Sequence, residues 1–110
     1  MKFRRLTVVG LFAALASVAA PLLAEGDAAA GKNKTSMCAG CHGIPGFRAA
    51  YPETYQVPML GGQNPGYIVA ALKAYKAGER SHPTMKAIAS SLSEQDMADL
   101  AAYYADAGRK

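Results

Sequence analysis

Five consecutive residues in the first half of the chain constrain its fold more than any other feature. They are Cys38-Ala39-Gly40-Cys41-His42, and they contain both cysteines of the 110-residue sequence. Two thiols one helical turn apart can add to the two vinyl groups of a single porphyrin, and the histidine that follows can bind the iron. The pattern therefore predicts covalent attachment of one haem c through Cys38 and Cys41, with His42 as the proximal iron ligand.

Two other kinds of site also use a Cys-X-X-Cys pair. A zinc site needs two further nitrogen or sulfur ligands at suitable spacing, and only His82 is left over. A thioredoxin-like redox pair is expected between a strand and a helix, and no strand pattern surrounds Cys38. Haem attachment is the interpretation that the sequence favours.

The first 24 residues have the features of a secretory signal peptide. Residues 1–5 carry three basic side chains, residues 6–20 form an apolar run, and the small residue Ala24 precedes the acidic Glu25. The apolar run is shorter than the ~20 residues that a membrane-spanning helix needs. We expect cleavage after Ala24, export to the periplasm without stable membrane insertion, and one domain at residues 25–110.

The basic charge of the full chain comes mostly from this signal peptide. The sequence has 12 Lys and Arg against 8 Asp and Glu, but three of the basic residues lie among the first five positions. The remaining balance is close to neutral, and two haem propionates would make it slightly negative. The charge therefore gives no support to nucleic-acid binding.

Helical patterns dominate the predicted domain. A helix is expected at residues 27–37, running into the Cys motif, and another at 65–77, with Asn64 as its N-cap and Gly78 at its end. Shorter helical structure is expected at 85–90. A last helix should begin after Ser93 and end at Gly108, and its apolar residues recur at helical spacing.

Residues 43–62 are predicted to form a loop. They contain three prolines and four glycines, and this stretch is long for an irregular segment of so small a domain. No strand pattern or internal repeat is found. The predicted fold class is therefore all-α, with three to five short helices wrapped around one covalently bound haem.

The sixth ligand of the iron separates electron transfer from chemistry at an open haem site. Met37 adjoins the Cys motif, and Met97 falls on the apolar face of the last helix, where a core role is favoured. Met85 and Met59 lie in or beside irregular segments that could cross the distal side of the haem. By chemistry alone the candidates rank Met85 first, Met59 second and His82 third.

Ordered sequence blocks across the predicted domain resemble class I c-type cytochromes, in particular bacterial cytochrome c4 domains and small cytochromes c-553. The blocks are the Cys motif followed by Gly43, the run Pro58 to Gln63, the run Leu72 to Arg80, and the stretch Met85 to Tyr104. The resemblance covers nearly the whole predicted domain. It implies the small class I cytochrome c fold with a single haem c.

The resemblance also assigns roles to individual residues. It implies that His42 and Met85 are the iron ligands and that the Pro58 carbonyl accepts a hydrogen bond from the His42 imidazole. It implies that the last helix crosses the first near Gly31, where a missing side chain permits close approach. Residues 44–57 depart from the pattern because they are longer than expected for this group.

Three residues in or near the long segment are further candidates. Arg48, Tyr51 and Gln63 could contact the haem propionates or the haem edge. A solvated loop that makes no such contact is an equally weighted interpretation.

The sequence favours a soluble periplasmic electron carrier over an enzyme, because it contains no convincing catalytic constellation. Its partners would be a dehydrogenase or bc1-type complex as donor and a terminal oxidase or reductase as acceptor. The alternative is a cytochrome subunit of a periplasmic dehydrogenase such as a flavoprotein sulfide dehydrogenase, which the segment Tyr75 to Arg80 also resembles. A sensor or peroxidase-like haem with an open site is a third class.

Overall fold

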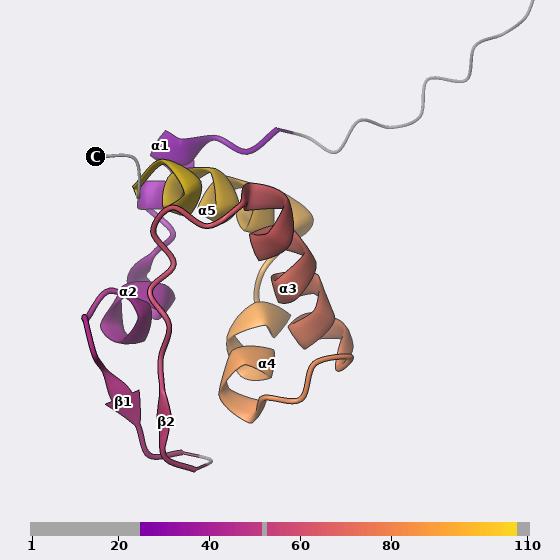
Figure 1. Ribbon diagram of the computed structural model, residues 1–110. Coiled ribbons are helices and arrows are strands. Elements are labelled where there is room, and N and C mark those ends of the chain that lie inside the picture. The colour runs from indigo at the N-terminus through magenta and orange to yellow at the C-terminus, as the bar shows by residue number, and fades with distance from the viewer. Residues whose placement is uncertain (1–24, 52, 108–110) are drawn as a thin grey trace, which may run out of the picture.

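A computed structural model describes residues 25–51 and 53–107. The described part of the chain contains five helices and one two-stranded sheet, which confirms the mainly helical fold class. Figure 1 shows α5 (Glu94–Ala107) crossing the top of the molecule, with α3 (Pro65–Ala77) and α4 (Pro83–Ser90) below one end. The predicted signal peptide at 1–24 and the predicted helix end at Gly108 lie outside the described residues.

The helix predicted at residues 27–37 is two helices. α1 (Ala28–Lys32) and α2 (Ser36–His42) are separated by a turn at 33–35, in which the Thr35 hydroxyl donates a hydrogen bond to the Lys32 carbonyl at 3.0 Å. The prediction of one continuous helix was wrong, because a hydroxyl side chain can bond to a nearby carbonyl and so compete with helix continuation. The Cys motif therefore lies on a short helix of its own.

The segment predicted as an irregular loop contains a small antiparallel sheet. β1 (Arg48–Ala49) pairs with β2 (Tyr55–Gln56), so that Arg48 lies opposite Gln56 and Ala49 opposite Tyr55. The prediction that the chain has no strands was wrong. Strands of two residues are too short to show an alternating pattern in the sequence.

The starts of α3 and α5 follow the predicted capping residues. The Asn64 side chain accepts a hydrogen bond from the Tyr67 amide at 3.0 Å, and Gly78 ends α3 with a φ of 80°. At α5, the Asp96 amide donates to the Ser93 hydroxyl at 3.0 Å, while the Ser93 amide donates to the Asp96 carboxylate at 2.9 Å. Reciprocal bonds of this kind satisfy backbone donors that would otherwise lack partners at a helix start.

The core lies where α3, α4 and α5 meet. α5 contributes half of the buried cluster, and its Met97 and Leu100 are each only 1% exposed. The prediction that Met97 fills the core is confirmed. The buried cluster consists of Ile68, Leu72, Ala89, Leu92, Met97, Leu100, Ala101 and Tyr104.

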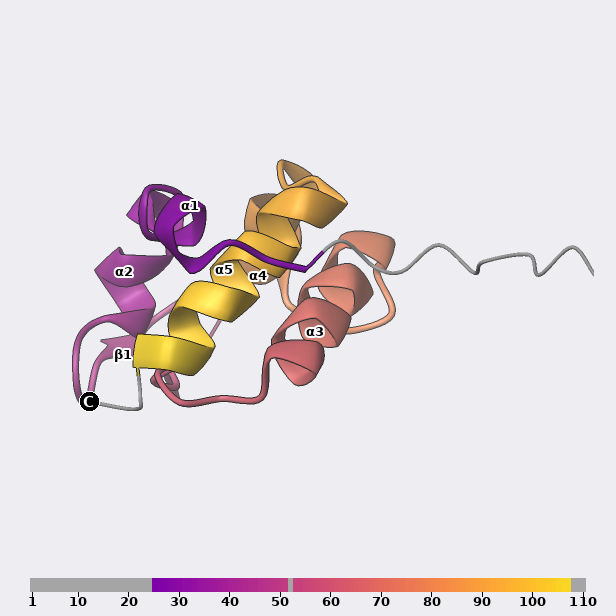
Figure 2. The same cartoon turned by 90° about the horizontal axis from the view of Figure 1, so that it is seen from above.

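α1 packs against α5 at a glycine. Figure 2 shows α1 on one side of α5 and α3 on the other. A Cβ atom placed on Gly31 would lie 2.0 Å from the Asp99 carbonyl oxygen and 2.9 Å from the Tyr103 Cβ. The predicted close crossing near Gly31 is therefore confirmed, and only a residue without a side chain fits there.

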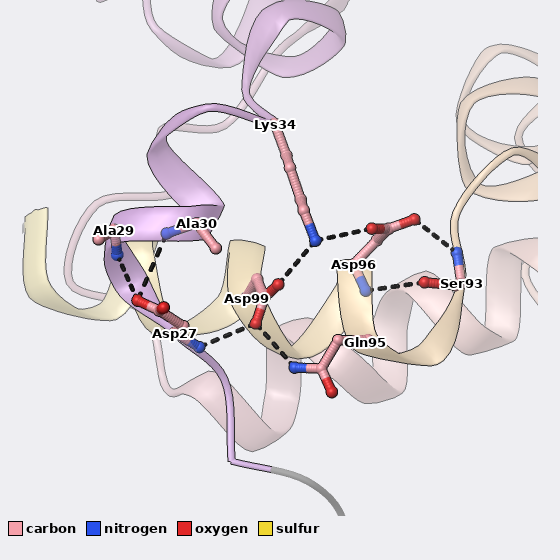
Figure 3. A network of polar contacts seen from close by, with 8 residues as sticks. All are labelled: Asp27, Ala29, Ala30, Lys34, Ser93, Gln95, Asp96 and Asp99. Atoms are coloured by element: carbon pink, nitrogen blue, oxygen red, sulfur yellow. Dashed lines mark hydrogen bonds and ion pairs between the residues drawn. The ribbon is translucent and has the colours of Figure 1, made fainter.

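A buried carboxylate fastens the start of the domain to α5 (Figure 3). Asp99, whose side chain is 4% exposed, accepts hydrogen bonds from the Asp27 amide at 2.8 Å and from the Gln95 side chain at 2.8 Å. Lys34 lies between two acids, 2.6 Å from Asp99 and 2.8 Å from Asp96. Every partner of this buried charge is thus supplied by residues of α5 or of the N-terminal segment.

None of the helices in the described ranges, 25–51 and 53–107, combines the length and the apolar character needed to cross a membrane.

Replacement of Gly31 by Ala should destabilise the protein by about 1–3 kcal/mol, because the added methyl group forces α1 away from α5. Urea unfolding measures the change. Ala29→Val serves as a control, since it adds bulk to the same helix at an exposed position. An unchanged midpoint for Gly31→Ala would contradict the tight crossing.

Acid should weaken the attachment of the N-terminal segment. Hydrogen bonds from the Asp27 amide, Lys34 and Gln95 lower the pKa of Asp99 from 3.8 to about 2. Lys34 and Ser93 likewise lower the pKa of Asp96 to about 2. These carboxyl groups bind protons more readily in the unfolded chain than in the folded protein. Their contribution to the free energy of unfolding is therefore fully present above about pH 4 and is lost as the pH falls toward 2.

Urea unfolding at about pH 5 and about pH 3 tests this expectation. Asp99→Asn should be less stable than the starting protein at the higher pH and should lose less stability on acidification. Equal losses in the two proteins would show that Asp99 does not carry the acid dependence.

Candidate haem-binding site

One face of α2 brings the predicted attachment residues together. Cys38, Cys41 and His42 are spaced at i, i+3 and i+4, which places them on the same side of a helix. All three line one cavity of about 390 Å³. No disulfide joins Cys38 to Cys41.

The orientation of His42 is fixed by a backbone group. Its Nδ1 lies 2.7 Å from the carbonyl oxygen of Pro58. Since a carbonyl can only accept, Nδ1 carries the proton in this bond, and in a neutral imidazole Nε2 then has the lone pair. A neutral imidazole held in this way has the tautomer that a metal ligand requires.

Cys38 is half-buried, as are Cys41 and His42. It packs against the core beside Tyr104. Burial raises the pKa of the Cys38 thiol above its usual value, and a hydrogen bond with Tyr104 partly offsets this. Burial, and then the neighbouring Cys38, likewise raise the pKa of Tyr104. Both groups are therefore neutral at physiological pH, as suits an apolar cavity wall.

The opposite wall of the cavity comes from α3 and α4. Met85 lies in the first turn of α4, is half-buried, and packs against the core cluster. Apolar side chains form much of the remaining lining. They include Val57, Leu60, Ile68, Leu72, Ile88 and Leu100.

The other candidates for the sixth ligand differ in their surroundings. Met59 and Met37 also line the cavity, but their side chains are 53% and 48% exposed. Met97 is buried in the core and is not part of the lining. His82 lines the cavity, and its Nδ1 accepts a hydrogen bond from the Met85 amide at 3.2 Å.

Of the three candidate propionate or edge residues, Gln63 lines the cavity. Arg48 and Tyr51 do not, and both are exposed on the β-hairpin segment. The cavity lining also includes residues to which the sequence pattern assigns no role in the site, among them Tyr55 and Tyr104. Helical spacing places Tyr104 on the core face of α5, whereas nothing local in the sequence singles out Tyr55.

These residues fit a covalently attached porphyrin. The cavity has two thiols and an imidazole on one wall, a thioether on the other, and a mainly apolar lining between them. The same residues suit zinc poorly. In residues 25–51 and 53–107, no three His, Cys, Asp or Glu side chains cluster as a metal site would require.

Comparison with known proteins gives a consistent result. The family model described as cytochrome c matches residues 24–106. The chain is 43% identical over 82 residues to cytochrome c-554(548) of Halomonas halodenitrificans, which covers 72% of this chain and 94% of that protein.

Two longer proteins are also similar. The chain is 42% identical over 82 residues to cytochrome c4 of Pseudomonas aeruginosa, covering 74% of this chain and 39% of that protein. It is 37% identical over 98 residues to the thiosulfate dehydrogenase electron acceptor of Stutzerimonas stutzeri, covering 80% of this chain and 44% of that protein. The chain thus matches about two fifths of the length of each of these two relatives.

Proposed function

Because the chain belongs to the cytochrome c family and is therefore an electron-transfer haem protein, we propose that it carries one electron on a haem whose iron is bound by His42 and Met85. Haem c supplies the ferric/ferrous couple when it is bound. The observation that chiefly supports this proposal is the single cavity lined by Cys38, Cys41, His42 and Met85.

Cys38 and Cys41 would hold the haem through two thioether bonds, each formed when a thiol adds its S–H across a vinyl double bond. Their spacing of one helical turn supports this assignment. Two covalent bonds to one short helix fix the haem in the cavity. Such fixation suits electron transfer, because a rigid site needs little rearrangement when its charge changes.

His42 and the Pro58 carbonyl would act together on the proximal side. The hydrogen bond of 2.7 Å from Nδ1 fixes the plane of the imidazole and increases the basicity of Nε2. Met85 would supply the distal ligand. A neutral thioether in an apolar cavity favours the reduced state, so this pair of ligands supports a relatively high reduction potential.

We place the carrier in the periplasm, on the strength of the signal peptide expected at residues 1–24. The similarity to an electron acceptor of thiosulfate dehydrogenase supports a dehydrogenase as the electron donor. The names of the relatives favour a carrier over the flavoprotein dehydrogenase subunit considered above, since they describe cytochromes and an electron acceptor.

Replacement of Met85 should abolish the weak far-red absorption band that methionine sulfur gives with ferric haem. Met85→Ala should also lower the reduction potential by about 80 mV or more, a tenth of the ~0.8 V range over which axial ligands set haem potentials. Met59→Ala is the matched control and should keep the band. Loss of the band only in Met59→Ala would show that Met59, and not Met85, is the distal ligand.

Replacement of both cysteines should abolish covalent attachment. Cys38→Ala/Cys41→Ala should show no haem mass on the denatured polypeptide, whereas the starting protein should carry one haem. Each single variant should keep its haem through one thioether and absorb at a longer wavelength, because one vinyl group remains conjugated. Haem retained on the denatured double variant would contradict the assignment.

A further inference from the structure

His82 is held at the start of α4 as its N-cap. Its backbone is extended, with φ −161° and ψ 104°, and its carbonyl accepts the first helical hydrogen bond from the Lys86 amide at 2.8 Å. Its Nδ1 accepts from the Met85 amide at 3.2 Å. The backbone of Met85 is thereby tied to the His82 ring.

The same imidazole contacts aromatic rings from two other parts of the chain. The Tyr55 ring lies edge-on to it, with centroids 4.9 Å apart and planes at 86°. The Tyr75 ring lies at 6.1 Å and 77°, and the Arg80 guanidinium stands 4.6 Å from the Tyr75 centroid. Edge-to-face aromatic pairs in this distance range are attractive beyond the area that they bury.

These contacts join structures on two sides of the cavity. Tyr55 belongs to β2, and Figure 1 shows the β-hairpin and α4 at the same end of the molecule, on opposite sides of it. Tyr55, His82 and Met85 all line the cavity. The His82 ring therefore links the 44–57 segment to the helical turn that carries Met85.

We propose that His82 is a positioning residue for the distal ligand: clasped by Tyr55, its imidazole holds the first turn of α4 so that the Met85 side chain stays directed into the cavity. This inference rests on the proposed role of Met85 as the ligand. In this proposal His82 has a role other than binding iron, and the long 44–57 segment holds the His82 ring in place through Tyr55.

The identity of the capping residue supports a role beyond capping. Asn, Asp, Ser and Thr are the usual N-caps, and each can accept a hydrogen bond from the third helical residue. Only a larger ring can make that bond and also reach a tyrosine on another segment. A histidine here thus makes the local capping bond to the Met85 amide and also a long-range contact with Tyr55.

Displacement of the distal ligand by imidazole measures how firmly Met85 is held. The ferric holoprotein is titrated with imidazole at a pH where imidazole is neutral, and loss of the far-red band is followed. His82→Ala should raise the apparent imidazole affinity about five- to tenfold, the factor that loss of an ordinary N-cap corresponds to. Its band without imidazole should remain.

Two further variants separate the cap from the ring contact. His82→Asn keeps an acceptor for the Met85 amide but loses the ring, and Tyr55→Leu removes the ring on the other side. Each should raise the imidazole affinity about threefold. The double variant His82→Asn/Tyr55→Leu should bind imidazole only slightly more tightly than either single variant, because both changes break the same contact.

Matched controls remove a cap or a tyrosine elsewhere. Ser93→Ala loses the cap of α5, and Tyr51→Ala removes a tyrosine that is 68% exposed and lies outside the cavity lining. Neither should change imidazole affinity. If His82→Ala and Tyr55→Leu bind imidazole as the starting protein does, or no more tightly than these controls, the positioning role is wrong although Met85 remains the ligand.

A failure of the ligand assignment itself looks different. A starting protein without the far-red band, or one whose band survives in Met85→Ala, would overturn the assignment of Met85 and with it this inference. Loss of the native low-spin spectrum in His82→Ala alone would show instead that His82 binds the iron.

Discussion

The central cavity is the constraint on which the rest of the structure depends. α2, which carries the Cys motif, has no buried residue, whereas the buried cluster is drawn from α3, α5 and the segment 89–92. A short helix with no residue in the core has little of its own to hold it against the domain. Covalent haem filling the cavity would supply what is missing, since it attaches to α2 and packs on the core from the other side.

The contact between α1 and α5 is stabilised without the haem. There α1 meets α5 at Gly31, and the buried Asp99 binds the backbone of Asp27 and the ammonium of Lys34. A buried carboxylate with three partners is favourable only while all of them remain, which makes this contact specific in geometry. The fold thus joins a polar fastening near its N-terminus to a cavity that needs a cofactor.

The parts of the fold that residue patterns alone predicted are those set by local bonds, whereas the crossing at Gly31 and the bond between Pro58 and His42 were expected from the family resemblance. The start of α3 at Asn64 and of α5 at Ser93 depend on partners three residues away, and helical spacing alone groups Cys38, Cys41 and His42. The parts that it could not predict depend on distant partners. Asp99 and Asp27 are 72 positions apart, and the strand pair at 48–49 and 55–56 is too short to leave a pattern.

The segment that departs most from the expected pattern connects the two sides of the site. Its residue Tyr55 packs on His82, whose ring accepts from the Met85 amide, and three positions later the Pro58 carbonyl accepts from His42. The supports of both proposed iron ligands therefore converge on four consecutive residues, 55–58. A shift of this short stretch would move the contacts of both proposed ligands together. Its pairing with residues 48–49 in the small sheet therefore helps to hold the site in place.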